Sequence, residues 1–356
     1  AAMIVAIGTA IVTATFPPQE RGKAIGIMGT AVGLGLLSGP ALGGWFIDTF
    51  GWRSIFYLRL PVSILGMAMA WVILREDNSS KSSKGFDFWG ATTLFVGLAS
   101  LLFALNQGQP RGWSSPLVLG FGAVGVILLA LFLVIEGRLA QPVLDLALFR
   151  RRFFASANAS LFLSFLSRRG IGLILPFFLI QAYHFPASRA GLLLITIPLT
   201  MTVVAPLSGW LSDRIGSHFL CPLGLAISVF GIFLLSDLNT SLLWSDIVVR
   251  LLVLGVGGSL FETPNNSSIM GAVREQRLGT ASAMVATMRS VGQSTGVALA
   301  GAVFASRQLF HAVQLTPEQA IVAGFRDTVL VALAISAAAF LTSLVGGRAT
   351  TQAQLK

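Results

Sequence analysis

Apolar segments about twenty residues long recur along the whole sequence, and they constrain the fold more than any other feature. A run of that length crosses the hydrocarbon layer of a bilayer as one helix. Only 11% of the residues are charged, whereas soluble domains carry about 25%. We therefore expect an all-α, multi-pass membrane protein whose first partner is the lipid bilayer.

Eleven membrane-spanning helices are expected, with short polar or Gly- and Pro-rich connectors between them. One connector, SRQLFHAVQLTPEQAIVAGFRD, is much longer than the others and is expected to be a loop. The expected helices cover residues 1–16, 24–47, 54–74, 88–106, 116–136, 154–182, 190–211, 219–236, 244–270, 279–304 and 325–346.

The connectors fall into two alternating sets that differ in positive charge. One set, together with the C-terminal tail, holds fourteen Lys and Arg residues, and the other set holds five. Because cytoplasmic loops are enriched in Lys and Arg, the C-terminus is expected in the cytoplasm and Ala1 outside. The predicted location is the inner or plasma membrane of a cell. The net charge of +10 is explained by basic connectors that set the orientation of the helices in the membrane, so nucleic acid is not an expected partner.

Several classes of function are disfavoured by what the sequence lacks. The single Cys221 and the absence of a Cys/His cluster indicate neither disulfides nor a metal site. No phosphate-binding loop is present, so we expect no enzyme and no ATP-driven pump. The histidines His184, His218 and His311 stand alone in loops or at helix ends and are expected to be structural.

The stretch GLGLLSGPALGGW, residues 33–45, holds five glycines and a proline inside an expected span. In water each Gly costs a helix about 1 kcal/mol and Pro about 3 kcal/mol relative to Ala. Gly35, Gly39 and Gly43 recur every four residues and so share one helix face, where small residues let helices approach closely in lipid. On spacing alone, simple helix packing explains this stripe as well as a specific function does.

A short internal repeat is also visible. PPQERGKAIGIM (17–28) aligns with VREQRLGTASAM (273–284), and each segment leads into a glycine-spaced helix. Membrane carriers are often built from such repeats, so the alignment favours a transporter.

These segments resemble one family. GLGLLSGPALGGW is similar to the antiporter motif of exporters in the major facilitator superfamily, and WRSIFYLRLPVSI resembles the sixth span of its fourteen-span drug:proton antiporters (the EmrB/QacA type). GWLSDRIGSH is similar to the second copy of the family's cytoplasmic loop motif, and ETPNNSSIM with ATMRSVGQSTGVALAGAVF resembles later spans. The implied antiporter-motif residues are Gly35, Gly39, Pro40, Gly43 and Gly44, and the implied gating-loop residues are Gly209, Asp213, Arg214 and Gly216.

The resemblance implies a major facilitator fold in which the eleven helices are family spans four to fourteen. We therefore expect the sequence, which begins without Met, to be preceded by three further spans. The implied divisions are the rest of an N-terminal bundle (1–74), two extra central spans within 75–137, a cytoplasmic linker (138–153), a C-terminal six-span bundle (154–346) and a cytoplasmic tail (347–356).

Ionisable groups at bilayer depth are costly and so are functional candidates. Arg168 and Arg169 lie near the middle of an expected span, about 20 Å from either end at 1.5 Å per residue. They point about 100° apart on a helix, so they cannot face the same partner. The alternative is a shifted span boundary or a contact with a helix end. Binding of an anionic substrate by this pair is a further hypothesis.

Other polar residues in the spans suggest a cavity. Glu262, with Asn265 and Asn266 beside it, is either a proton-binding or cation-contacting carboxylate or a solvated group at a cavity mouth. Arg289 and Gln293 follow helical spacing with small residues, which favours a cavity-facing helix seam. Asp213 and Arg214 end a span, where an ion pair and a helix-end contact are expected to close a gate. An ordinary charged cap of the helix is the alternative.

The sequence thus predicts a secondary transporter that exports drugs or other amphipathic small molecules by proton antiport and alternating access. The proton is the expected coupling ion, no other cofactor is expected, and a periplasmic adaptor is a candidate partner. A major facilitator importer and an exporter of metabolites or lipids are alternatives. A membrane fragment or accessory subunit that does not transport is the alternative from another class.

Overall fold

The structure is a computed structural model that describes residues 2–17, 19–51, 53–73, 88–137, 146–238, 243–273 and 278–354. All regular elements among these residues are helices. Their bounds are α1 (Ala2–Thr15), α2 (Arg21–Phe50), α3 (Ser54–Ile73), α4 (Phe88–Arg111), α5 (Pro116–Glu136), α6 (Leu146–Phe149), α7 (Arg152–Gln181), α8 (Ala187–Leu194), α9 (Thr196–Ile215), α10 (Ser217–Ser236), α11 (Trp244–Gly271), α12 (Leu278–His311) and α13 (Pro317–Gln354).

Each of the eleven expected spans is helical, but two expectations about them are wrong. The span expected at 190–211 is divided at Ile195 into α8 and α9. Pro198 explains the division, because it has no N–H to donate to the carbonyl four residues earlier. The expected boundary at residue 346 is also wrong, since α13 continues through Gln354 into the segment assigned to the tail.

The long loop expected between the last two helices is mostly helical. α12 continues to His311 and α13 begins at Pro317, so only residues 312–316 connect them. At the start of α13, the Gln319 N–H donates to Thr316 Oγ1 at 3.4 Å, and the Thr316 N–H donates to Gln319 Oε1 at 3.3 Å. This reciprocal capping box, followed by Pro at the first helical position, ends the connector early.

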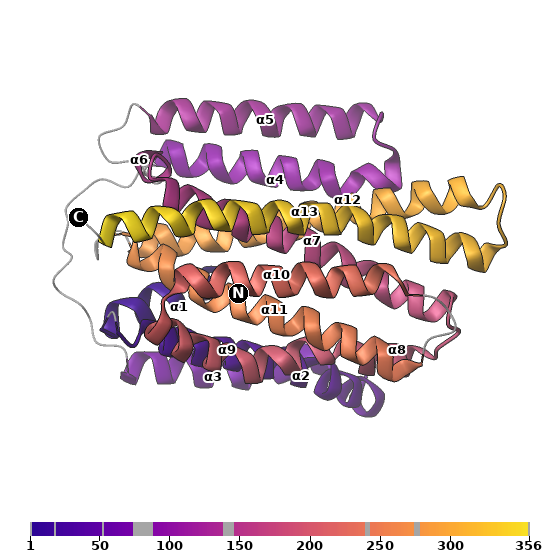
Figure 1. Cartoon of the computed structure of the whole chain (residues 1–356), viewed down its shortest axis with the longest axis horizontal. Coiled ribbons are helices and arrows are strands. Elements are labelled where there is room, and N and C mark those ends of the chain that lie inside the picture. The colour runs from indigo at the N-terminus through magenta and orange to yellow at the C-terminus, as the bar shows by residue number, and fades with distance from the viewer. Residues whose placement is uncertain are drawn as a thin grey trace.

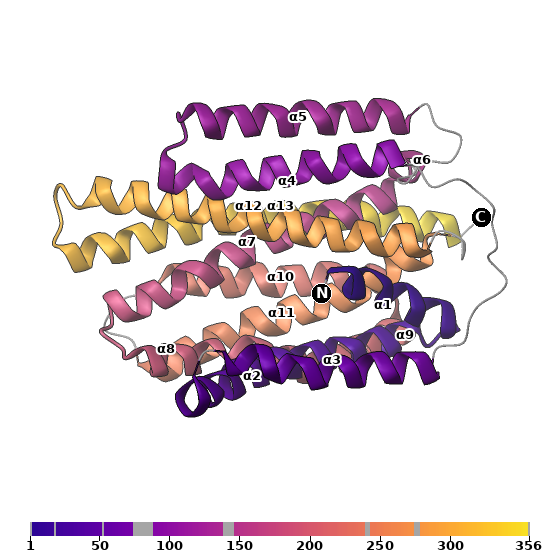
Figure 2. The same cartoon turned by 180° about the vertical axis from the view of Figure 1, so that it is seen from behind.

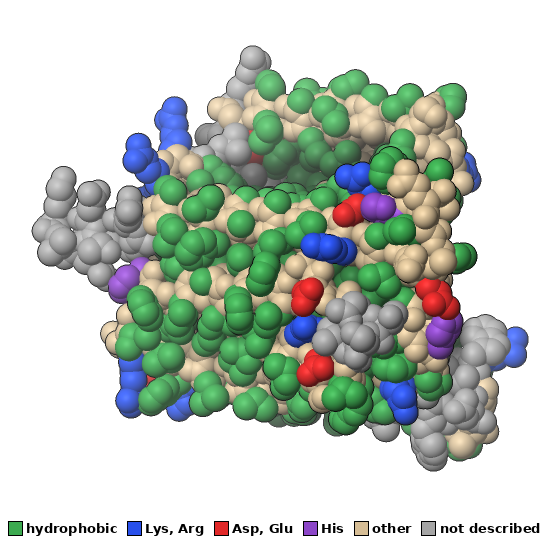
Figure 3. All heavy atoms as spheres, turned by 45° about the vertical axis from the view of Figure 1, so that its right-hand side comes forward, with side chains coloured by type: hydrophobic (Ala, Val, Ile, Leu, Met, Phe, Trp, Pro, Cys, Tyr) green, Lys and Arg blue, Asp and Glu red, His purple; other side chains and the backbone are tan. Residues whose placement is uncertain are grey.

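The helices run between two ends of an apolar body. Eight helices in the described part of the chain are long and apolar enough to cross a membrane. In Figure 1 the C-terminal end of α13 and α6 lie at one end, and the α4–α5, α7–α8 and α12–α13 connections lie at the other. The flank in Figure 3 is largely apolar, with charged side chains gathered toward the ends. Which end faces the cytoplasm stays a prediction from the connector charges.

The helices are arranged in layers (Figure 2). α4 and α5 pack on each other beside α12, α7 and α10 to α13 form the middle, and α2, α3, α8 and α9 lie on the side opposite α4 and α5. The middle holds the main apolar core, in which Phe178 of α7 stacks on Phe325 of α13 with ring centroids 4.1 Å apart. By contrast, no residue of the apolar stretch Phe56–Ile73 in α3 is buried. The division into bundles drawn from the resemblance stays a prediction.

Candidate functional site

α2 and α9 meet along a contact that we call the α2–α9 seam, defined by Gly22, Gly26 and Gly33 of α2 and Gly209 of α9. A Cβ added at Gly26 would lie 2.7 Å from the Ala205 carbonyl oxygen. A Cβ at Gly209 would collide with the Gly22 backbone. The two backbones therefore touch, which only glycine permits, and this close approach compensates the helix cost of the glycines.

One carboxylate bonds across the end of the α2–α9 seam. Asp213 accepts a hydrogen bond from the Gly22 N–H at 2.9 Å and one from the Lys23 N–H at 2.8 Å. Both donors lie in the first turn of α2, where N–H groups are unsatisfied and the helix dipole favours an anion. The expected helix-end contact of Asp213 is therefore present.

The other residues of the predicted gating loop lie around this contact. Arg214 lies over the ring of Trp210 at 4.0 Å, so it stacks on its own helix instead of forming the expected ion pair with Asp213. Gly216 ends α9 with φ of +87°, a left-handed conformation that favours glycine and turns the chain into α10. The gating role of this loop stays a prediction.

The structure describes the helix of the predicted antiporter motif but only part of the motif's surroundings. α2 is helical throughout residues 33–45. A Cβ at Gly35 would meet nothing within 4 Å in the described part of the chain, so close packing at this residue is not observed. The surroundings of Gly39, Pro40, Gly43 and Gly44 lie outside the described residues. The stripe with observed contacts is instead the one in the α2–α9 seam.

Three of the predicted intramembrane residues meet in one cluster, which we call the charge cluster: Arg168 of α7, Glu262 of α11 and Arg289 of α12. Glu262 Oε1 lies 2.7 Å from Nη2 of Arg289, and its Oε2 lies 3.7 Å from Nη2 of Arg168. The side chains are 14–24% exposed. Glu262 thus bridges two cations, and the cluster carries a net charge of +1.

Aromatic and glycine neighbours position the two guanidinium groups. Both groups lie over the ring of Phe165, Arg168 at 5.3 Å and Arg289 at 5.1 Å from its centroid. Arg168 also lies against α11 at Gly258, where an added Cβ would collide with its Nη1. Its Nε approaches the Ser164 carbonyl oxygen at 3.4 Å. These contacts hold both cations independently of Glu262.

The charge cluster borders a small cavity of about 40 Å³ between α2, α9, α11 and α12. Glu262, Asn266 and Arg289 supply its polar wall, and Met28 and Val32 of α2 supply part of its apolar wall. The expected neighbour Asn265 points elsewhere, since its Nδ2 donates to the Ala157 carbonyl oxygen at 3.2 Å.

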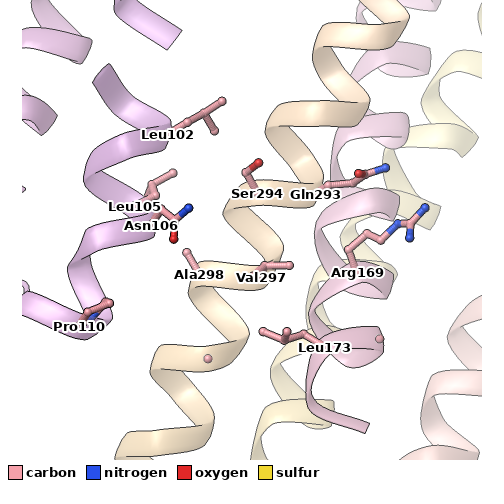
Figure 4. Close-up of a pocket in the computed structure, with 12 residues that line it drawn as sticks. Leu102, Leu105, Asn106, Pro110, Arg169, Leu173, Gln293, Ser294, Val297 and Ala298 are labelled. Atoms are coloured by element: carbon pink, nitrogen blue, oxygen red, sulfur yellow. The ribbon is translucent and has the colours of Figure 1, made fainter. Parts of the chain in front are cut away.

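Arg169 and Gln293 belong to a different place. They line a cavity of about 710 Å³ between α4, α7 and α12 (Figure 4). In this view Arg169 and Gln293 project to the same side of their helices, whereas Ser294 faces Asn106 of α4 across the gap. The prediction that the two consecutive arginines face different surroundings agrees with this geometry.

Two histidine–carboxylate pairs were missed from the sequence. His184 Nε2 lies 3.1 Å from Glu318 Oε1, and His311 Nε2 lies 3.0 Å from Asp327 Oδ2. Arg307 Nε approaches the same Asp327 oxygen at 3.3 Å. The expectation that His184 and His311 stand alone was wrong. Their partners lie on α13, and no local spacing indicates a contact between separate helices.

Comparison with known proteins decides the family. The Major Facilitator Superfamily profile matches residues 1–161 and residues 157–345. The chain belongs to the major facilitator superfamily. It is accordingly an integral membrane protein with the fold of that superfamily, as the sequence predicted.

Its relatives include named transporters. The chain is 31% identical over 317 residues to the riboflavin transporter RibZ of Clostridioides difficile, covering 87% of this chain and 67% of RibZ. It is 33% identical over 312 residues to the multidrug resistance protein Stp of Mycobacterium tuberculosis, covering 86% of this chain and 57% of Stp. The chain thus spans between about half and two thirds of the length of these relatives.

Among solved structures, the human organic anion transporter MFSD10 has a similar fold. The TM-score is 0.60 with 20% sequence identity, covering 93% of this chain and 67% of MFSD10. At this identity the likeness concerns the fold alone.

Proposed function

We propose that the complete protein is a secondary active transporter that exports drugs or other amphipathic small molecules by proton antiport. The observation that carries the proposal is the Asp213 contact across one end of the α2–α9 seam, with the small cavity and the charge cluster deeper along the same helices. Such a contact can close a cavity from one side, which alternating access requires.

The chemistry of that contact suits repeated opening. The carboxylate of Asp213 and the two N–H groups of α2 lie at the ends of their helices, so water can replace each partner when the helices separate. The glycines of the α2–α9 seam let the helices return to close contact without rearranging side chains. The seam is therefore the place where movement costs least.

The names of these relatives support transport and leave its direction and substrate open. The similarity to a multidrug resistance protein favours drugs, and the similarity to a riboflavin transporter keeps a vitamin or another metabolite as the second candidate. An importer, or an accessory subunit that does not transport, would be revealed by the same experiment.

The test is flux through the complete protein reconstituted in liposomes with an imposed proton gradient. Ethidium and riboflavin are suitable fluorescent probes because they differ in charge. Antiport predicts that at least one probe moves opposite to the proton flow, and that nigericin, which collapses the pH gradient, abolishes the movement. Movement of a probe with the protons would identify an importer. No gradient-dependent flux of any tested drug or metabolite would contradict the proposal.

A further inference from the structure

We propose that the charge cluster is the binding site for an anionic group, a carboxylate or sulfonate, of an amphipathic substrate, and that Glu262 occupies its place when the substrate is absent. The inference rests on the proposed function, because it names the substrate class of the transporter. Its residues are Arg289 as the principal ligand, Arg168 as the second cation and Glu262 as the internal competitor.

The charges of the cluster are the first reason. Arg168 lies near the middle of α7, and Glu262 and Arg289 lie about 14 and 17 Å from the nearer ends of α11 and α12. The three side chains are only 14–24% exposed. A buried cation without its own counter-ion is costly. The net positive charge of the cluster therefore favours the binding of one more anion.

The geometry of Glu262 is the second reason. A carboxylate bonds a guanidinium best through two parallel hydrogen bonds along one edge. Glu262 instead divides its oxygens between two arginines, and its contact with Arg168 at 3.7 Å is too long for a hydrogen bond. Nε of Arg289 and Nη2 of Arg168 are buried without a hydrogen-bond partner among the described residues.

An incoming carboxylate can make the contact that Glu262 does not. Nε and Nη2 of Arg289 lie side by side on one edge of the guanidinium, and Glu262 uses only Nη2. A substrate carboxylate on that edge would take both donors, and Glu262 would remain beside Arg168. Because Phe165 and Gly258 position the cations, the site does not depend on Glu262 staying in place.

The surroundings specify an amphipathic anion. The small cavity places Met28, Val32 and Met201 next to Glu262 and Arg289, so a charged head would bind beside an apolar body. Two of these three apolar residues come from α2, and opening the α2–α9 seam would enlarge the cavity toward the cluster. A cationic substrate fits less well, because it would have to displace an arginine from Glu262.

Binding to the complete purified protein tests the site. The probes are dansylglycine, which has a carboxylate, and dansylglycinamide, its neutral analogue. A hydrogen bond to a charged group contributes more free energy than one to a neutral group. We therefore expect dansylglycine to bind about tenfold or more tightly than dansylglycinamide. Arg289→Gln should remove this preference, and Arg289→Lys should restore only part of it, since Lys keeps the charge but lacks the two-donor edge.

Glu262→Gln provides the decisive contrast. Because this variant removes the internal competitor, it should bind dansylglycine more tightly than the wild-type protein. If Glu262 only formed a structural ion pair, Glu262→Gln would instead weaken dansylglycine binding, as Arg289→Gln does. Arg326→Gln is the matched control, since Arg326 is exposed on α13 and lies outside the cluster. It should leave both affinities unchanged.

Two results would overturn the site. One is equal affinity of the wild-type protein for the two probes, and the other is weaker dansylglycine binding in Glu262→Gln. The liposome flux of ethidium and riboflavin, with dansylglycine added as an anionic probe, separates this failure from failure of the proposed function. Gradient-driven flux without a preference for the carboxylate would contradict the anion site alone. Absence of any such flux would contradict the proposed transport function.

Discussion

Two helix contacts in this protein use glycine in the same way and differ in where their polar groups lie. In the α2–α9 seam, Gly26 and Gly209 bring two backbones into contact. In the second contact, the α7–α12 seam, Gly170, Gly292 and Gly296 do the same between α7 and α12. A Cβ at Gly292 would lie 2.7 Å from the Phe162 carbonyl oxygen.

The polar groups distinguish these two contacts. The α2–α9 seam has a carboxylate, Asp213, bonded to backbone N–H groups at one end. The α7–α12 seam has two arginines at mid-depth, with Arg168 and Arg289 over the same aromatic ring and Glu262 between them. Water can replace polar partners at a helix end but not in the middle of a bilayer. The comparison therefore predicts movement at the α2–α9 seam and rigidity at the α7–α12 seam.

The largest expected loss of stability is that of Gly296→Ala in the α7–α12 seam. The new methyl group would collide with the Leu166 carbonyl oxygen, and the backbone cannot move aside as a side chain can. Overpacking of this kind costs about 1–3 kcal/mol. We expect a clearly lower thermal midpoint of the purified complete protein. Gly279→Ala on the same helix is the control, since its Cβ would meet nothing within 4 Å among the described residues and should leave the midpoint unchanged or raise it.

A smaller loss of stability, with a larger loss of transport, is expected from Gly26→Ala in the α2–α9 seam. Its methyl group would lie 2.7 Å from the Ala205 carbonyl oxygen, which prevents the helices from closing fully. A seam that opens during transport can relax apart, so the thermal midpoint should fall less than in Gly296→Ala. Liposome flux and the thermal midpoint are both measured.

The control for this change lies on α3, outside both the α2–α9 seam and the predicted antiporter motif. Gly66→Ala places a methyl group where nothing lies within 4 Å in the described part of the chain. It should retain the flux that Gly26→Ala loses. An equal loss of flux in both variants would show that the α2–α9 seam has no special role.

The helices could be predicted from the sequence, but the partner face of α2 could not. The length of each apolar run is a local property, and it located helical structure at each of the eleven expected positions. The glycines of α2 form two sets at helical spacing, one beginning at Gly22 and one at Gly35, and periodicity alone favours neither. Only the position of α9 decides between them. The α12–α13 loop was overestimated because the TPEQ capping signal at residues 316–319 went unused.

The members of the charge cluster could be predicted, but their meeting could not. Arg168, Glu262 and Arg289 were each singled out because ionisable groups are costly in a bilayer. They come from three helices, and a single sequence carries no information on which helices adjoin. The same limit explains why the partners of His184 and His311 on α13 were missed.

The smallest effect on folding is expected from Asp213→Asn, which tests the movable end of the α2–α9 seam. The two N–H groups donate to different oxygens of Asp213. Asn keeps one acceptor oxygen without the charge and replaces the other by an NH2 group that cannot accept, so one hydrogen bond is weakened and the other is lost. A hydrogen bond to a charged acceptor is worth about 1.5–3 kcal/mol, and less near water. We expect the thermal midpoint to change little and the open state to gain population by about tenfold, since 1.4 kcal/mol corresponds to that factor.

The rate of maleimide labelling of Thr202→Cys measures the increase in the open-state population that we expect for Asp213→Asn. Thr202 lies against Gly33 of α2 across the α2–α9 seam and is half-buried, so a cysteine at this position should be labelled more readily when the helices separate. In a cysteine-free background, Asp213→Asn should increase the labelling of Thr202→Cys, and Asp237→Asn, an exposed substitution at the end of α10, should not. Unchanged labelling in Asp213→Asn would mean that the α2–α9 seam is as permanent as the α7–α12 seam, and the movement would then have to lie elsewhere.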